Sequence, residues 1–177
     1  QFLRVVQQAP FGNRVSDVSH AIQEVVEALR IPMLLVTDHE ADDAIGTLAV
    51  RAAAQGIEAT IVTADRDFFQ LVRPGLRVLF NRRGISDIAL MDEAAVEERF
   101  GLPPSKYLEY VALKVDTSDN IPGVPGVGDK TAARLVQEFG SVEELLARTD
   151  ELKGKLKENI EAAGERPALN KNLARIV

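Results

Sequence analysis

Short apolar runs alternate with helix-like stretches over the first half of this sequence. Residues 33–36, 59–63 and 76–80 are rich in aliphatic and β-branched side chains, which is typical of short buried strands. Residues 40–55 and 65–72 lie between them and carry apolar side chains at helical spacing. A helix between two such strands usually returns the chain in the same direction, so the strands pair in parallel. The pattern predicts an α/β fold with a parallel twisted sheet flanked by helices.

The rest of the chain follows other patterns. Residues 1–14 have no clear period and end in a Pro-Phe-Gly-Asn turn signal, so we expect a loop there, followed by an amphipathic helix that opens at Ser16 and stops before Pro32. Beyond Asp92 strand signals vanish, and the spacing predicts short helices over 92–100, 105–114, 130–139, 141–147, 152–163 and 168–177. We therefore expect an α/β core over 1–113 and a helical region over 114–177.

Composition narrows the class of protein. The 177 residues include 46% hydrophobic and 27% charged side chains, as in soluble globular proteins. There is no cysteine, which excludes disulfides and thiolate metal sites. No apolar run is long enough to span a bilayer, and the first residues do not resemble a secretory signal, so a cytoplasmic protein is expected. The net charge of −6 would argue against a nucleic-acid partner, but the acids are concentrated in a few short stretches.

Two of these acidic stretches follow predicted strands. Glu40, Asp42 and Asp43 come after the strand that ends at Val36, and Asp65 and Asp67 come after the strand that ends at Thr63. The carboxyl ends of parallel strands meet at one edge of a sheet, where ligands bind. Five carboxylates at such an edge suit Mg²⁺ or Mn²⁺, and a pair of these ions can hydrolyse phosphodiesters.

Helix capping is the alternative explanation for each acidic group. Acids in a helix's first turn stabilise it by capping and by interaction with the helix dipole, and for either group alone this is the commoner explanation. Capping uses one or two acids. It does not account for Asp42 and Asp43 together with a second acidic pair after the next strand.

A glycine-rich segment precedes the predicted helix 130–139. Two prolines and three glycines in residues 121–128 require tight turns, and Gly126-Val127-Gly128 leads directly into the helix. Backbone N–H groups at such a helix start can bind a phosphate without reading a base, with Lys130 adding positive charge. Generic turn formation is the alternative. The spacing does not match a Walker A loop, because Asp129 separates Gly128 from Lys130.

In this order, the segments 40–43, 63–67 and 116–132 resemble the 5′-nuclease (flap endonuclease) family. The resemblance is closest to the 5′→3′ exonuclease domain of bacterial DNA polymerase I and its stand-alone bacterial relatives, and it covers about residues 16–177. It implies a PIN-like 5′-nuclease core with a helix–three-turn–helix motif. The implied activity is two-metal hydrolysis of DNA at 5′ flaps and 5′ ends in replication and repair. The implied partner is branched or nicked duplex DNA, bound by a monomer in the bacterial nucleoid, with a DNA polymerase fused or associated.

The resemblance also implies roles for individual residues. Glu40 and Asp42 would serve the first Mg²⁺ or Mn²⁺ ion, Asp65, Asp67 and Asp119 the second, and Asp43 and Asp116 would bind through water or orient the inner ligands. The residues expected to hold duplex phosphates, with a potassium ion on hairpin carbonyls, are Gly123, Gly126, Gly128, Lys130, Thr131 and Arg134.

The sequence departs from the family pattern in two places. The family begins with a strand that carries a metal-binding Asp, then a second such Asp and a basic arch, and none of these is seen before Ser16. Val115 stands where the family usually has Gly. The simplest explanation is that the 177 residues are a fragment, or the ordered part, of a longer chain, and we then expect weak or absent catalysis from them. A non-catalytic DNA-junction-binding relative is the alternative. A metal-dependent nuclease that acts on RNA is a third hypothesis, which the glycine segment disfavours.

Overall fold

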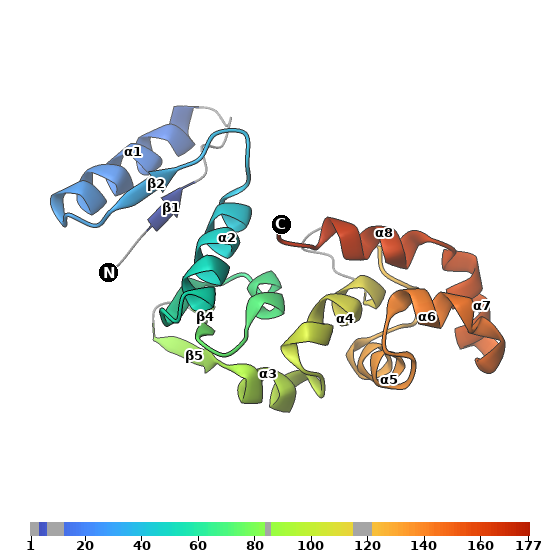
Figure 1. The fold of residues 1–177 in the computed structure, drawn as a ribbon. Helices are drawn as coiled ribbons and strands as arrows, with labels where there is room; N and C mark the ends of the chain where they lie inside the picture. Colours follow the sequence, from blue (N-terminus) through green and yellow to red (C-terminus); the bar gives the residue numbers. More distant parts are fainter. Residues whose placement is uncertain (1–3, 7–12, 84–85, 115–121) are drawn as a thin grey trace. The chain divides into compact units, whose positions relative to one another are not determined.

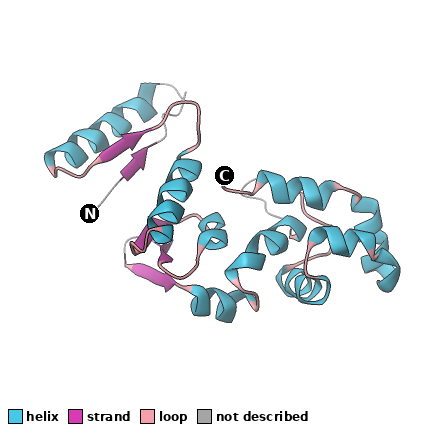
Figure 2. Cartoon of the chain, in the orientation of Figure 1, coloured by secondary structure: helices cyan, strands magenta, loops and turns pink. Residues whose placement is uncertain are grey.

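A computed structural model describes residues 4–6, 13–83, 86–114 and 122–177. The chain forms two compact units, which are described separately below. The first comprises residues 1–48 together with Val177, and the second comprises residues 49–176. Figure 1 shows the order of the elements, and Figure 2 shows that helices predominate after the last strand. None of the described helices is long and apolar enough to cross a membrane.

The first unit contains one parallel strand pair and a helix. Strand β1 (Arg4–Val6) pairs in parallel with β2 (Met33–Leu35), and helix α1 (Asn13–Ala28) connects them. The expectation of a loop over 1–14 is therefore wrong for residues 4–6 and 13–14. A three-residue strand is too short to show a period of its own and depends on pairing with β2, which is distant in the sequence. No carboxylate lies in β1.

Helix α2 (Ala41–Ala54) matches the helix predicted over 40–55, and the boundary between the two units falls within it. Gly56 follows the helix with φ of +74°. Glycine populates this left-handed region without steric cost, which is why it ends helices so often.

The sheet of the second unit is mixed rather than wholly parallel. Strands β3 (Ala59–Thr63) and β4 (Leu76–Arg83) pair in parallel as predicted, whereas β5 (Asp87–Met91), which the sequence pattern missed, runs antiparallel to β4. The connection between β4 and β5 spans only residues 84–86, and so short a link can only reverse the chain. The helix predicted over 65–72 is a 3₁₀ helix, η1 (Asp67–Leu71).

Each stretch predicted to be helical beyond Asp92 contains a helix. The sequence continues with α3 (Glu93–Phe100), η2 (Pro104–Lys106), α4 (Tyr107–Leu113), α5 (Asp129–Phe139), α6 (Val142–Ala147), η3 (Thr149–Glu151), α7 (Gly154–Ala163) and α8 (Arg166–Leu173). The predicted helix 105–114 is a 3₁₀ turn followed by α4, and α8 ends at Leu173 instead of 177. The α/β fold class with a helical C-terminal part is confirmed.

Aromatic side chains join the sheet to the helices in the second unit. Phe69 of η1 is fully buried, and its ring centroid lies 5.1 Å from Phe80, 5.8 Å from Phe100 and 5.6 Å from Tyr107. Phe68 is buried as well, so the prediction that both phenylalanines are core residues is confirmed. A buried Phe side chain contributes about 2–3 kcal/mol. This packing fixes η1, which begins at Asp67.

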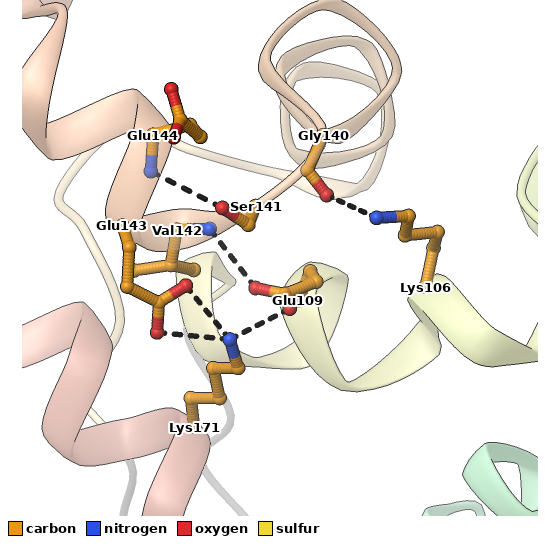
Figure 3. Close-up of polar contacts among 8 residues, drawn as sticks. All are labelled: Lys106, Glu109, Gly140, Ser141, Val142, Glu143, Glu144 and Lys171. Carbon is orange, nitrogen blue, oxygen red and sulfur yellow. Dashed lines mark hydrogen bonds and ion pairs between the residues drawn. The ribbon is translucent and has the colours of Figure 1, made fainter.

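A buried ion pair joins three of the C-terminal helices (Figure 3). Lys171 Nζ of α8 lies 2.7 Å from Glu109 Oε1 of α4 and 2.8 Å from Glu143 Oε2 of α6. Glu109 Oε2 accepts a hydrogen bond from the Val142 N–H at 2.9 Å. Lys106 Nζ donates to the Gly140 carbonyl at 2.7 Å, at the end of α5. These contacts hold α4, which precedes the glycine segment, against its neighbours.

Candidate functional site: an acidic turn, a glycine hairpin and a basic pocket

The first acidic group lies at the start of α2 in the first unit. Asp42 and Asp43 occupy the first turn of the helix and are half-buried, while Glu40 precedes the turn and is exposed. The Glu40 carbonyl accepts the Ala44 N–H at 3.4 Å. Two aspartates here interact favourably with the positive end of the helix dipole. The predicted position after a strand and at a helix start is therefore observed.

The second acidic group forms a tight, hydrogen-bonded turn in the second unit. Thr63 Oγ1 accepts the Asp65 N–H at 3.0 Å, and Asp65 Oδ1 accepts the Asp67 N–H at 2.8 Å. The capping interpretation thus holds for Asp65. It does not exclude metal binding, since an ionised carboxylate has about four lone-pair sites and this turn uses one of them. We call residues 65–67 the acidic turn.

The Asp67 carboxylate influences a nearby phenol. Burial raises the pKa of Tyr107, and the negative charge of Asp67 raises it further. The two side chains are therefore close within the second unit.

The other predicted metal ligands lie in the first unit or outside the described residues. Asp116 and Asp119 lie outside the described residues, and Glu40, Asp42 and Asp43 belong to the other unit. Within the described part of the chain, no three His, Cys, Asp or Glu side chains gather in an arrangement that could hold a metal ion. The convergence of the three acidic groups stays a prediction.

The glycine segment forms the tight turns that its composition predicts. Gly123 and Gly126 have φ values of +44° and +77°. The Val124 N–H donates to the Leu113 carbonyl at 2.9 Å, and the Val127 N–H donates to the Val124 carbonyl at 3.0 Å. Both valines are buried and anchor the segment, whereas Gly126 is exposed. We call residues 122–128 the glycine hairpin.

Helix α5 begins directly after the hairpin. Gly128 occupies the N-cap position, so no side chain covers the first N–H groups of the helix. Lys130 and Arg134 are exposed and lie four residues apart, which places them on one face of the helix, and Thr131 is half-buried beside them. The residues predicted to bind phosphates therefore surround one helix start.

A pocket of about 280 Å³ borders this helix start. We call it the basic pocket, and it is lined by Arg66, Arg99, Phe100, Tyr110, Lys114, Asp129, Lys130 and Ala133. Its walls come from the acidic turn, the end of α3, the end of α4 and the first turns of α5. Arg66 of the acidic turn and the start of α5 therefore line one pocket.

Sequence reasoning missed five polar residues of the basic pocket: Arg66, Arg99, Tyr110, Lys114 and Asp129. Arg66 stands between two aspartates, and a single basic residue within an acidic stretch does not indicate an anion site. Arg99 and Lys114 lie at the ends of predicted helices, where basic side chains interact favourably with the dipole and usually face solvent. No spacing rule relates these positions, so no sequence signal identified them.

Asp129 is the centre of the pocket's hydrogen bonding. The Tyr110 hydroxyl donates to Asp129 Oδ1 at 2.6 Å, and Lys114 Nζ lies 3.1 Å from the same oxygen. The Tyr110 hydrogen bond, followed by that from Lys114, lowers the pKa of Asp129. Burial and the bond to Asp129 raise the pKa of Tyr110. The pocket therefore contains an ionised carboxylate and a neutral phenol at neutral pH.

Comparison with known proteins covers nearly the whole chain. A family model described as the 5′-3′ exonuclease N-terminal resolvase-like domain matches residues 9–101, and one described as the 5′-3′ exonuclease C-terminal SAM fold matches residues 102–177. DNA polymerase I of Bacillus caldotenax is 44% identical over 171 residues, which are 96% of this chain and 19% of the polymerase. The chain thus spans about a fifth of the length of this relative.

Solved structures resemble the fold. A variant of T5 5′-exonuclease superposes with a TM-score of 0.79 at 19% identity, covering 97% of this chain and 71% of that one. The bacteriophage T5 D15 flap endonuclease, solved as a pseudo-enzyme-product complex with DNA and metal ions, superposes with a TM-score of 0.73 at 18% identity, covering 93% and 62%. At these identities the likeness establishes the fold.

Proposed function

The chain belongs to the 5′-3′ exonuclease family, and from that premise we propose that it hydrolyses phosphodiester bonds of DNA at 5′ flaps and 5′ ends. One observation carries the proposal beyond family membership. Arg66, which stands between the two aspartates of the acidic turn, lines the same basic pocket as Asp129 and Lys130 at the start of α5, so the carboxylates of the turn are sequence neighbours of a pocket residue. A nuclease needs both parts close to one phosphodiester, because one part holds the DNA backbone while the carboxylates of the other hold the metal ions that act on the bond.

Divalent metal ions are the second part of the proposal. Asp65 and Asp67 are half-buried hard-oxygen donors, and the hydrogen bonds of the acidic turn orient Asp65, so the residues present fit Mg²⁺ or Mn²⁺. We propose that Glu40, Asp42 and Asp43 with Asp116 and Asp119 complete a two-ion site. Two bound ions supply activation of a water and stabilisation of the leaving oxygen.

The glycine hairpin is proposed to hold the duplex. Backbone N–H groups at the start of α5 donate to a phosphate, and the positive end of the helix dipole favours its charge. Lys130 and Arg134 extend this contact along the strand, Thr131 adds a hydroxyl donor, and the hairpin carbonyls are available to a potassium ion. Binding of this kind contacts the backbone and is independent of base sequence.

The biological setting follows from the relatives. Because relatives with 44% and 41% identity are DNA polymerases I, we propose that the chain works with a polymerase, fused or separate, on nicked and branched DNA in the bacterial nucleoid. A monomer suffices, since the proposed parts all come from one chain.

The test is cleavage of a duplex that carries a labelled 5′ flap, in Mg²⁺, in Mn²⁺ and in EDTA. We expect metal-dependent release of the flap at the low rate that the sequence predicts for these 177 residues, and loss of this release for Asp65→Ala/Asp67→Ala. The control is Asp87→Ala/Asp150→Ala, which removes two exposed carboxylates elsewhere in the same unit and is expected to cleave normally. Cleavage by Asp65→Ala/Asp67→Ala at the normal rate would refute the proposed site.

A junction-binding protein that does not cut DNA is the second candidate. Its support is that the start of α5 offers exposed Lys130 and Arg134 and uncapped backbone N–H groups, which can bind DNA without any metal ligand. Flap binding without cleavage in either metal, by a chain that melts cooperatively, would favour this candidate over the nuclease.

A further inference from the structure

Basic side chains outnumber acidic side chains in the lining of the basic pocket. Four basic side chains line it, Arg66, Arg99, Lys114 and Lys130, against the single carboxylate of Asp129. Asp129 already pairs with Lys114 at 3.1 Å. Within the described residues, no carboxylate forms an ion pair with Arg66, Arg99 or Lys130. Within the part of the chain that the structure describes, the four cations of the pocket therefore outnumber the one carboxylate that lines it, although the charge of Asp129 also acts on Arg66.

The two arginines of the pocket repel one another. Burial lowers the pKa of Arg99, and the positive charges of Arg66 and then Arg82 lower it further. A guanidinium is so basic that it stays charged under these conditions. Such like-charge proximity is unfavourable, and an anion placed between the arginines relieves it.

Aromatic rings orient two of the four cations, Arg99 and Lys114, without neutralising them. The Arg99 guanidinium carbon lies 5.6 Å from the Phe80 ring centroid and 5.4 Å from that of Phe100. Lys114 Nζ lies 5.7 Å from the Tyr110 ring. Cation–π contacts orient the side chains but leave their full charge available to a ligand. The pocket is thus organised in advance for an anion.

The size and the donors of the pocket suit a phosphate group. Its volume of about 280 Å³ is near the lower limit for small-molecule sites, which is room for a phosphate with its adjoining sugar rather than for a large ligand. Planar guanidinium groups bind phosphate oxygens in bidentate fashion. The start of α5 adds the positive end of a helix dipole on the same side as Lys130.

We propose that the basic pocket is a phosphate-binding site in which Arg66 and Arg99 grip one phosphate group of the DNA substrate. The inference rests on the proposed function, because it assumes DNA as the ligand, and it adds a contact separate from the glycine hairpin. Arg66 lies between Asp65 and Asp67, so the bound phosphate sits beside the acidic turn. The contact positions the strand there and takes no part in bond cleavage.

Binding in EDTA tests this inference independently of cleavage. The affinity of the chain for a fluorescent 5′-flap duplex is measured by anisotropy between 50 and 200 mM salt, for the wild type and for Arg66→Gln/Arg99→Gln. We expect about tenfold weaker binding at the lowest salt, and a slope of log affinity against log salt that is shallower by about 1. An unchanged slope and affinity would overturn the proposal.

Two variants separate a specific contact from general charge and from misfolding. Arg166→Gln removes one exposed positive charge on α8, outside the basic pocket, and should bind within twofold of the wild type. Arg66→Lys/Arg99→Lys keeps the charge and should retain the wild-type salt slope with reduced affinity. If Arg166→Gln lost as much affinity as Arg66→Gln/Arg99→Gln, the basic pocket would have no special role.

Two forms of the DNA distinguish the source of the phosphate. A terminal 5′-phosphate would give tighter binding of the phosphorylated than of the hydroxyl-ended flap, and Arg66→Gln/Arg99→Gln would lose this preference. An internal phosphodiester would give the same loss on both forms. Either result supports the basic pocket and assigns its ligand.

A direct readout keeps the inference separate from the nuclease proposal. The side-chain Nε–H signals of Arg66 and Arg99 are followed by ¹⁵N NMR while the 5′-phosphorylated dinucleotide pTpT is added. We expect saturable shifts of both signals and none at Arg166. Shifts without any cleavage of flap DNA would contradict the nuclease alone, whereas cleavage without these shifts would contradict the basic pocket alone.

Discussion

The Tyr110 hydroxyl donates a 2.6 Å hydrogen bond to the carboxylate of Asp129, which joins α4 to the first turn of α5. Asp129 directly follows Gly128, so this bond fixes the point at which the glycine hairpin becomes a helix. Lys114, at the C-terminal end of α4, reinforces the contact from the same side. Since Tyr110 is buried among Phe100 and Tyr107, the hairpin is positioned by the aromatic core.

Removal of this hydroxyl should destabilise the protein modestly. Tyr110→Phe is expected to lower the free energy of unfolding by about 1 kcal/mol at pH 7, because the Asp129 side chain is 70% exposed and water replaces the lost donor. Urea denaturation followed by circular dichroism measures the change. A loss above about 3 kcal/mol would mean that the hydroxyl has a structural role beyond this bond.

The effect of Tyr110→Phe should disappear in acid. The folded state lowers the pKa of Asp129 below its ordinary value of 3.8, first through the Tyr110 bond. A lowered carboxyl pKa stabilises the fold above the unfolded-state value, and this contribution is lost as the pH falls through the folded-state value. The stability difference between wild type and Tyr110→Phe should therefore shrink as the pH falls below about 3.8. An equal difference at pH 7 and in acid would contradict this explanation.

Lys171 should be far more important to stability than other lysines. Lys171→Met leaves the buried Glu109 carboxylate without its partner, which typically costs about 3–5 kcal/mol. Glu109→Gln/Lys171→Met removes both charges and should recover part of the loss. The control is Lys157→Met, whose pair with Glu161 is 3.7 Å long and largely exposed, with an expected change below about 0.5 kcal/mol. Equal losses for Lys171→Met and Lys157→Met would show that the buried pair contributes nothing special.

The ion pairs of Lys171 with Glu109 and Glu143 should make the free energy of unfolding depend on pH within a defined range. Burial lowers the pKa of Lys171, but its bonds to Glu109 and Glu143 outweigh burial and leave the pKa above the ordinary 10.5. The contribution of Lys171 to the stability of the fold is thus fully present below pH 10.5. It is lost as the pH rises through the folded-state pKa of Lys171. The bond to Lys171 lowers the pKa of Glu143 below 4.5, so its contribution is present above 4.5 and is lost toward acid.

Thermal melting across pH tests this window. We expect the difference between wild type and Lys171→Met to be greatest between about pH 5 and pH 10 and to narrow at both extremes. A difference that kept growing above pH 11 would be inconsistent with these shifts.

Gly126 should matter both to folding and to DNA binding. Its φ is +77°, and an added Cβ would lie 3.2 Å from Asn159 Nδ2, which donates to the Pro125 carbonyl. Gly126→Ala should cost about 1–2 kcal/mol and weaken flap binding, because the hairpin backbone must shift. Gly164→Ala is the control: its φ of +55° is also positive, so the substitution strains the backbone, but an added Cβ would meet nothing within 4 Å, and Gly164 lies far along the chain from the hairpin. It should lose stability while binding DNA normally.

The comparison of the two glycine variants is informative in both directions. If Gly164→Ala also weakened binding, the loss in Gly126→Ala would reflect reduced stability. If Gly126→Ala bound DNA normally, the glycine hairpin would not contact the duplex.

Local patterns were enough to predict most helices and turns. The helix predicted over 92–100 is present because Asp92 caps it, accepting the Ala95 N–H at 2.9 Å, and because Gly101 ends it in the left-handed conformation. Gly56 and Gly126 adopt positive φ where a turn or a helix end requires it. These features depend on a few neighbouring residues, so they are visible in the sequence.

Strands depended on partners that are distant in the sequence. β1 was missed because three residues show no period, and only its pairing with β2 makes it a strand. β5 was missed for a similar reason, since its side chains are mostly exposed and its order comes from β4. The expectation of a wholly parallel sheet was wrong at β5, where a short connection forces an antiparallel strand.

By itself, the sequence determined the family, the helices and the two motifs, because each depends on residue types at short spacing. Only the tertiary structure gathered Arg66, Arg99, Lys114 and Lys130 around one cavity. These residues come from four segments that share no periodicity. Their proximity arises from the packing of Phe69, Phe100, Tyr107 and Tyr110, because side chains distant in the sequence meet only when a common core brings their backbones together.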